Sequence, residues 1–170
     1  MSGSALRHIK RVNSTSTVNY VAVTNCFSAE YDIYKITLSP IDSAGSDLFF
    51  RFLTTSNQVV NSSVYRDAVL LQRAYGAAVQ NQSSSVDGIG SIGFSDLSDK
   101  GSGTTIWVYN PFREDYYTTV SWQNAGASSS GTPARRGVGE LQQSSKITGI
   151  RFHQTNILKL DVNVYGLRES

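Results

Sequence analysis

The clearest hydrophobic pattern in the chain is a strict alternation near its C-terminal end. Over residues 158–165, leucine and valine take every second position, and the positions between them carry polar side chains or tyrosine. A period of two is typical of a strand that buries one face. A second apolar run covers residues 147–152, and four polar residues at 153–156 separate the two runs. The pattern predicts a closing hairpin of two antiparallel strands with a turn at 153–156.

Short β-prone runs recur along the rest of the chain, with polar turns between them. The run 65–75 also fits one face of a helix, and we favour the strand interpretation. About eight to ten short strands with no dependable helix predict an all-β fold. We expect a single-domain antiparallel β-sandwich, with a jelly roll ahead of an immunoglobulin-like topology. The other predicted strands are 6–12, 18–23, 34–38, 48–53, 59–60, 89–94, 104–109, 116–123 and 138–141, the last as a short edge strand. Within 48–53 the face that carries Phe50 and Phe52 is expected to point into the core, and so is the leucine and valine face of 158–165.

Two polar segments predict exposed loops. Residues 80–87 are a low-complexity run of Gln, Asn and Ser, and residues 124–136 combine Gly, Ser and Ala with two arginines. Neither segment has a hydrophobic period, which is typical of surface loops. The positions expected to be exposed there are Ser83, Ser84, Ser85, Arg135 and Arg136.

Composition narrows the classes of partner. Charged residues make up 16% of the chain and the formal net charge is +2, too little for the clustered Lys and Arg of a nucleic-acid or anionic-membrane surface. No apolar run is long enough to span a bilayer, and the N-terminal residues lack the apolar stretch of a signal peptide. We therefore expect synthesis in the cytoplasm, no membrane insertion and no nucleic-acid partner. The single cysteine, Cys26, excludes an internal disulfide and is expected to be a buried apolar residue.

Candidate chemistry is sparse. The two histidines, His8 and His153, show no nucleophile elbow or metal-ligand spacing and are expected at strand ends or turns. A smaller alternative places His153 near a symmetry axis, where copies from several subunits meet around an ion. Asp87, Asp96 and Asp99 lie in predicted loops, where a solvated turn is favoured over a calcium site. The sequence thus predicts a protein that is not an enzyme, with no catalytic residue, no metal and no cofactor.

Aromatic residues concentrate between positions 107 and 122, next to Asn, Asp and Ser. A ring face packs against the apolar face of a sugar while neighbouring polar groups bind its hydroxyls, so this segment is a candidate glycan or receptor contact. Ordinary packing of two strands is the alternative, and we favour it. The candidate residues are Trp107, Tyr109, Tyr116, Tyr117 and Trp122.

Several motifs follow one another in order along nearly the whole chain. They read LRHIKRV, FSAEYDIYKITLSPI, DLFFRFLTTS, IWVYNP and ITGIRFHQTNILKLDVNVYGL, the last closing on Val164, Tyr165, Gly166 and Leu167. In this order they resemble a widespread group of short virion proteins of tailed bacteriophages, especially marine and cyanobacterial phages. Members of that group read F-S-x-x-Y-D-x-Y-K near the start and end in L-Y-G-L or L-Y-G-I.

The resemblance implies a β-sandwich appendage protein of the virion, tail-fibre-like and without catalytic residues. It implies a symmetric homo-oligomer, with a trimer expected, in contact with other virion proteins and with a host surface glycan. The expected function is that of a compact trimeric knob of the tail or fibre apparatus that takes part in host attachment. Residues 1–24 would be the attachment segment and residues 25–170 the jelly-roll domain. Capsid decoration, as a head fibre or cement protein, is one alternative, and a free carbohydrate-binding module is another.

Overall fold

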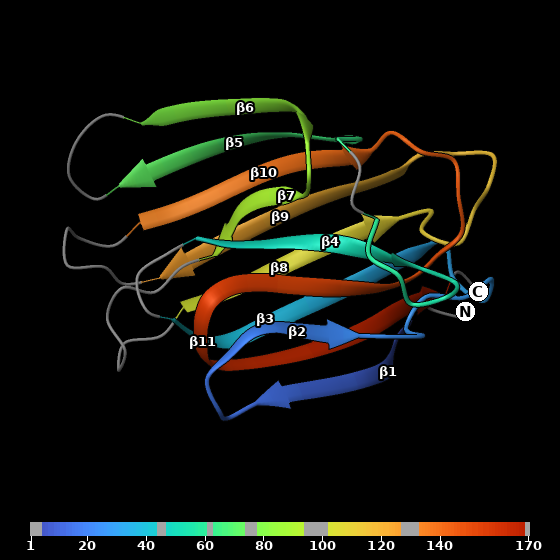
Figure 1. The fold of residues 1–170 in the computed structure, drawn as a ribbon, viewed down its shortest axis with the longest axis horizontal. Helices are drawn as coiled ribbons and strands as arrows, with labels where there is room; N and C mark the ends of the chain where they lie inside the picture. The colour runs from blue at the N-terminus through green and yellow to red at the C-terminus, as the bar shows by residue number, and fades with distance from the viewer. Residues whose placement is uncertain are drawn as a thin grey trace.

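The computed structural model describes residues 5–43, 47–60, 63–73, 78–93, 102–126 and 133–168. Within these ranges the secondary structure is entirely β, with turns and no helix, as Figure 1 shows. This confirms the predicted all-β class. The strands are β1 (Ala5–Ser14), β2 (Val18–Val23), β3 (Ile33–Ser43), β4 (Leu48–Thr54), β5 (Tyr65–Arg73), β6 (Val79–Val86), β7 (Ile89–Gly93), β8 (Ser102–Tyr109), β9 (Thr118–Gly126), β10 (Pro133–Leu141) and β11 (Ile147–Arg168).

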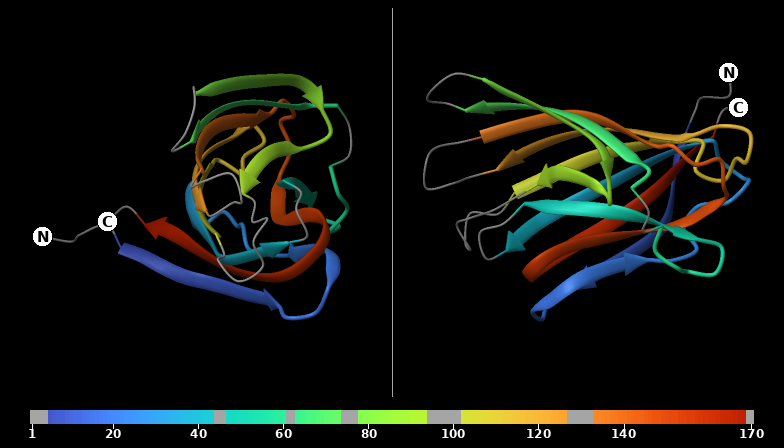
Figure 2. Two further views of the ribbon diagram at one scale, coloured as in Figure 1. Left: turned by 90° about the vertical axis from the view of Figure 1, so that its left-hand side faces the viewer. Right: turned by 45° about the horizontal axis from the view of Figure 1, so that its top comes forward.

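All strand pairs are antiparallel, and the strands form two layers joined through β11. The large layer has the order β6-β5-β10-β9-β8-β3-β11-β1, and the small layer has the order β7-β4-β11-β2. Figure 2 shows the large layer curling so that the two layers face each other. The chain is therefore an antiparallel β-sandwich of jelly-roll type, as the alternating pattern predicts.

β11 corrects the predicted closing hairpin. It is one strand of 22 residues that turns a corner between the layers, visible as the bent C-terminal ribbon of Figure 1. Residues 147–153 pair with β4 and β2, whereas residues 157–167 pair with β3 and β1. Asn156 has a φ of 58°, a left-handed conformation that asparagine tolerates. The chain does change direction at the polar segment 153–156, but the strand segments on either side of it pair with other strands and not with each other.

The core lies between the layers and is built by the alternating positions. Phe50 and Phe52 of β4 and Val162 and Val164 of β11 are fully buried, which confirms their predicted faces. Cys26 is also buried, and its Sγ donates a hydrogen bond to the carbonyl of Val23 at 3.4 Å. Burial raises the pKa of the Cys26 thiol to about 12, as expected of an unreactive buried cysteine.

Several predicted loops and boundaries are wrong. The segment predicted as the loop 80–87 is mostly β6, an edge strand of the large layer that pairs with β5. The predicted loop 124–136 is partly strand, because β9 continues to Gly126 and β10 begins at Pro133; residues 127–132 lie outside the described ranges. β10 is also no edge strand, since it lies between β5 and β9. An edge or outer-face strand needs no apolar alternation, so its sequence can resemble a loop.

Two further strands differ less from the prediction. β3 does not stop before Pro40 but passes it with a shift in register against both neighbours, β8 and β11. Proline lacks a backbone donor, and an irregularity in the ladder is where a sheet accommodates it. The ambiguous run 65–75 is strand over its described part, Tyr65–Arg73.

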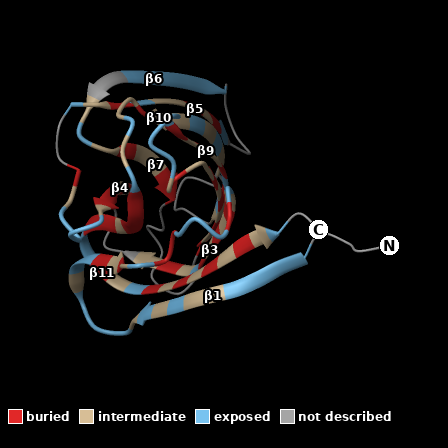
Figure 3. Ribbon diagram, turned by 90° about the vertical axis from the view of Figure 1, so that its right-hand side faces the viewer, coloured by how far each residue is buried: buried red, intermediate tan, exposed pale blue. Residues whose placement is uncertain are grey.

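The N-terminal strands complete the sandwich. β1 and β2 both pair with β11, β1 against its C-terminal half and β2 against its N-terminal half. β1 is exposed along much of its length (Figure 3). Its predicted attachment role stays a prediction.

Candidate functional site

The outer face of the large layer carries an apolar row at its centre. In successive strands β8, β9, β10 and β5, the residues Trp107, Ser121, Val138 and Ala68 are direct partners in register. Their neighbours along each strand, such as Ile106 and Val120, point into the core. We call these four residues, with the adjacent Tyr109 and Leu70, the outer patch.

Val138 is the most exposed member of the outer patch, with 58% of its surface accessible. The outward face of an antiparallel sheet is normally polar, because only the inward face is covered. An exposed valine that lies between Ser121 and Ala68, with Trp107 one strand further along the same row, is therefore typical of a contact surface. No pattern in the sequence indicates this row, since Val138 joins Trp107 only through the strand register.

Two of the shallow hollows on this face adjoin Val138, one on each side. The first measures about 540 Å³ and is lined by Trp107, Ser121 and Arg136 among others. The second measures about 790 Å³ and is lined by Tyr109, Ser121 and Glu140 among others. Trp107 and Tyr109, both half-buried, thus form walls of neighbouring depressions. These two of the predicted contact residues therefore lie on an accessible surface.

Charges of both signs surround the outer patch. The Nζ atom of Lys35 lies 5.8 Å from the ring centroid of Trp107, within cation–π range. Arg66 and Glu140, opposite each other on β5 and β10, approach to 4.0 Å. The exposed Arg136 adds a further cation at the edge of the first hollow. The face is therefore apolar at its centre and mixed in charge around it.

Trp122 corrects the aromatic prediction. It lies on the inner face of β9 and is only 2% exposed, so it makes no contact with a ligand on the surface. Its ring lies over Gly137, its register partner on β10, where a Cβ atom would come within 2.6 Å of Cε2. The glycine leaves the space that the indole fills. Trp122 shares this inward face with Val120, two residues earlier on β9 and also buried, as alternation along a strand requires.

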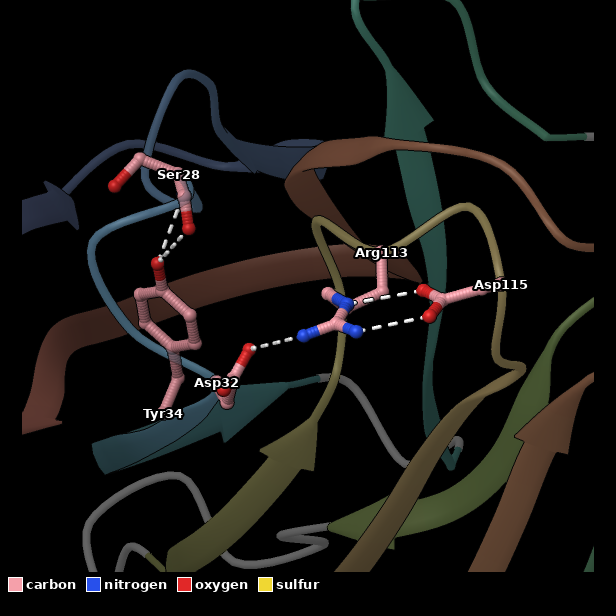
Figure 4. A network of polar contacts seen from close by, with 5 residues as sticks. All are labelled: Ser28, Asp32, Tyr34, Arg113 and Asp115. Carbon is pink, nitrogen blue, oxygen red and sulfur yellow. Dashed lines mark hydrogen bonds and ion pairs between the residues drawn. The ribbon is translucent and has the colours of Figure 1, made fainter.

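Tyr116 and Tyr117 are exposed, but they lie in the connection between β8 and β9 and not on the sheet. Figure 4 shows how Arg113 orders this connection. Its guanidinium donates to both carboxylate oxygens of Asp115, at 2.9 and 2.8 Å, and lies 3.8 Å from Asp32. These hydrogen bonds hold the pKa of Asp115 below its usual range. The same guanidinium lies over the ring of Tyr116, 5.2 Å from its centroid.

The segment that Arg113 reaches is anchored by Tyr34, also drawn in Figure 4. The Tyr34 hydroxyl donates to the carbonyl of Ser28 at 2.9 Å and accepts from the Ser28 amide at 2.8 Å. Burial raises the pKa of this hydroxyl. Tyr116 and Tyr117 thus lie on a loop that the contacts of Arg113 hold in place, separate from Trp107 and Tyr109.

The predicted exposed positions divide. Ser83 is exposed, but on strand β6, while Ser84 and Ser85 belong to the same strand and their side chains lie outside the described part. Arg136 is exposed on β10. Arg135 is not an exposed loop residue: its side chain is 11% accessible and its Nη1 lies 2.7 Å from Asp47. Alternation along β10 turns these two arginines to opposite faces.

No catalytic or metal constellation was predicted, and the described part of the chain contains no group of three His, Cys, Asp or Glu residues placed to hold a metal ion. Asp87 lies 3.9 Å from Arg51, and Asp96 and Asp99 lie outside the described residues. The His8 ring packs edge-on against Tyr165 at 5.3 Å. His153 is buried in β11, contrary to its predicted place in a turn. In the same described ranges, no helix could span a membrane.

Comparisons with known proteins give a fold likeness only. No protein-family model matches the chain, and neither does any curated protein. The chain is similar to SCLam, a non-specific endo-β-1,3(4)-glucanase from family GH16, at 6% identity and a TM-score of 0.29, covering 88% of this chain and 63% of SCLam. It is similar to the catalytic domain of an endo-1,3-β-glucanase (laminarinase) from Thermotoga petrophila RKU-1 at 7% identity and a TM-score of 0.27, covering 99% and 79%. A Bacillus licheniformis β-glucanase follows at 12% identity and a TM-score of 0.23, covering 93% and 71%.

Scores at this level carry no argument about activity. The functional argument therefore rests on the residues of this chain. Its accessible outer patch can contact a flat partner surface or a sugar ring, and it is the strongest candidate that the large layer offers.

Proposed function

We propose that this chain is a non-enzymatic structural protein of a tailed-phage virion, a compact jelly-roll knob that assembles into a symmetric homotrimer through its outer patch. The observation that carries the assembly is the exposed Val138 in an apolar row on a sheet face. The motif order along the sequence supports the virion assignment. The other virion proteins and a host surface glycan are its proposed partners.

The apolar row favours contact with a protein partner over exposure to solvent. Burying the accessible surface of Val138 and the exposed part of Trp107 contributes roughly 25 cal/mol of binding free energy for each Å² of apolar surface removed from solvent. A sheet face on which the hollows are shallow can pack against a second sheet or loop. Contact between copies of the chain removes the same exposed surface from each of them.

The charges around the patch suit contact between copies. Arg66, Arg136 and Lys35 provide cations and Glu140 provides an anion on the same face. A surface with both signs can oppose its cations to the anions of another copy. A face of one sign would repel itself.

The mass of the protein in solution tests this proposal. We expect a trimer, and we expect Val138→Asp to shift it toward the monomer because the carboxylate would be desolvated in the contact. Because Val138 is exposed in the single chain, Val138→Asp should not unfold the domain. The dissociated variant should therefore still show the melting transition of a folded domain. Val79→Asp is the matched control, because Val79 is also exposed but lies on the edge strand β6.

A monomeric parent protein, or a Val138→Asp variant that stays trimeric, would contradict assembly through the outer patch. The first result would favour the second candidate, a free carbohydrate-binding module, because Trp107 and Tyr109 would then line open hollows beside Gln80 and Ser83. In that case Trp107→Ala should abolish binding on a glycan array without changing the melting temperature. Trp122→Ala is unsuitable for this test, because it would empty part of the core.

A further inference from the structure

The outer face of the small layer carries two arginines in direct opposition. Arg51 of β4 and Arg151 of β11 are register partners. Two positions further along β11, His153 lies between Phe49 of β4 and Tyr20 of β2, its partners on either side. We call these five residues the arginine row. The three strands that carry it run side by side in Figure 1.

Like charges placed opposite each other destabilise a sheet, and within the described ranges only one of the two arginines has a carboxylate partner. Arg51 donates from Nε to the carbonyl of Asp87 at 2.7 Å and lies 3.9 Å from its carboxylate. Arg151 has no carboxylate partner among the described residues. Its Nε donates instead to Nε2 of His153 at 2.9 Å, a neutral acceptor that leaves the positive charge in place.

His153 positions Arg151 without neutralising it. The hydrogen bond from Arg151 requires an unprotonated Nε2. Burial and the charges of Arg151 and Arg51 lower the pKa of His153 to about 4, so the ring is neutral at ordinary pH. Its face stacks on Phe49, with ring centroids 5.1 Å apart and an interplanar angle of 8°. The imidazole is therefore a fixed acceptor.

Aromatic rings fix both guanidinium groups. Cζ of Arg151 lies 4.5 Å from the ring centroid of Tyr20, and Cζ of Arg51 lies 5.5 Å from that of Phe49. Tyr20 is 52% exposed, so part of its ring remains open to a ligand. A guanidinium group stacked on an aromatic ring has little conformational entropy left to lose when it binds a ligand.

We propose that Arg51 and Arg151 bind a carboxylate or sulfate group of an acidic polysaccharide, with the exposed ring of Tyr20 contacting the adjoining sugar. The planar guanidinium of Arg151 matches the oxygens of such an anion through charge-assisted hydrogen bonds, and Arg51, its register partner, adds a second positive charge on the same face. The net charge of only +2 fits a single anionic group better than a long polyphosphate. This site is on the opposite layer from the outer patch, and it does not depend on the proposed assembly.

The test is a binding titration with purified full-length protein. The probes are oligomers of a uronic acid, a sulfated dextran, neutral dextran, inorganic sulfate and a single-stranded DNA oligonucleotide. We expect the two acidic glycans to bind, neutral dextran not to bind, and Arg151→Gln or Arg51→Gln to weaken binding by at least about tenfold. Tyr20→Ala should weaken binding of the glycans while leaving the weak binding of inorganic sulfate unchanged.

Arg168→Gln is the matched control, because Arg168 is exposed at the C-terminal end of β11, outside both the arginine row and the outer patch, and its loss removes the same charge; it should leave binding unchanged. Arg151→Lys keeps the charge but loses the planar fork, and it should fall between the parent and Arg151→Gln. Equal weakening by Arg168→Gln would reduce the effect to net charge and overturn the site. Binding of sulfate alone, or of DNA as tightly as the acidic glycans, would overturn the assignment to an acidic polysaccharide.

Discussion

The absence of a side chain at Gly137 decides where the largest ring of the core lies. Trp122 on β9 occupies the space over Gly137 on β10, and this places its indole inside the sandwich. Trp107, one strand away on β8, faces outward and lines a hollow. Two tryptophans that look equivalent in the sequence thus have opposite roles, one in stability and one on the surface.

Gly137→Ala should destabilise the protein. The new methyl group would overlap the Trp122 ring, and overpacking of this kind costs typically about 1–3 kcal/mol. The free energy of unfolding, from urea denaturation, measures the effect. Gly103→Ala on β8 is the matched control, because the nearest atom to a Cβ there is 3.6 Å away.

If Gly137→Ala were as stable as Gly103→Ala, the indole would not occupy the space over β10. The inward orientation of Trp122 would then be wrong, and Trp122 would return to the group of surface aromatics.

Among the elements, β11 organises the sandwich. Its N-terminal half belongs to the small layer and its C-terminal half to the large layer. The corner includes Asn156, whose φ of 58° is unfavourable for a residue branched at Cβ. The corner also brings His153 into the arginine row, because the strand remains in register with β2 and β4 up to that residue.

Asn156→Val should destabilise the protein, whereas Asn156→Gly should be nearly neutral. A non-glycine residue in the left-handed region costs about 1–2 kcal/mol, and a branched side chain lacks the local hydrogen bonding that helps asparagine. Asn156 is exposed, so the change in burial is small. Melting temperatures of the two variants measure the difference, with Thr155→Val as the control for an exposed neighbouring position in the same strand.

An Asn156→Val protein as stable as the Asn156→Gly protein would show that the corner does not require a left-handed residue. The bend of β11 would then depend on the pairing of its two halves alone.

The molecule as a whole presents two separate surfaces. The outer patch lies on the large layer and the arginine row on the small layer, so one copy can contact a neighbour with the first and a ligand with the second. β1 and β6 form the two edges of the large layer. β6 is rich in Gln and Ser. Its lack of apolar surface, more than any charge, discourages uncontrolled pairing with another strand at that edge.

The copy number of the chain in purified particles tests its place in the virion. A knob of the tail or fibre apparatus should be present in few copies, in a multiple of three, as quantitative mass spectrometry against the major capsid protein would show. A number that follows the capsid protein would favour capsid decoration instead. Absence from particles would contradict the virion assignment and leave the binding-module alternative.

The fold class and most of the core could be predicted from the order of residues alone. Alternation in 48–53 and 158–165 identified Phe50, Phe52, Val162 and Val164 as inward residues, because one face of a half-buried strand must be apolar whatever its neighbours are. The same reasoning failed for β6 and for the ends of β9 and β10. An edge strand such as β6, and the ends of central strands such as β9 and β10, gain their stability from backbone pairing and leave little hydrophobic pattern.

The two surfaces, in contrast, emerge only when the strands are assembled. Trp107 joins Val138, and Arg51 faces Arg151, through the register of strands that are distant in sequence. The bend of β11 likewise replaced a hairpin, since a polar segment signals a change of direction but not which strands its arms will pair with. Local pattern fixes which face of a strand is buried, whereas neighbours across a sheet are chosen by long-range packing, and that choice creates both candidate binding surfaces.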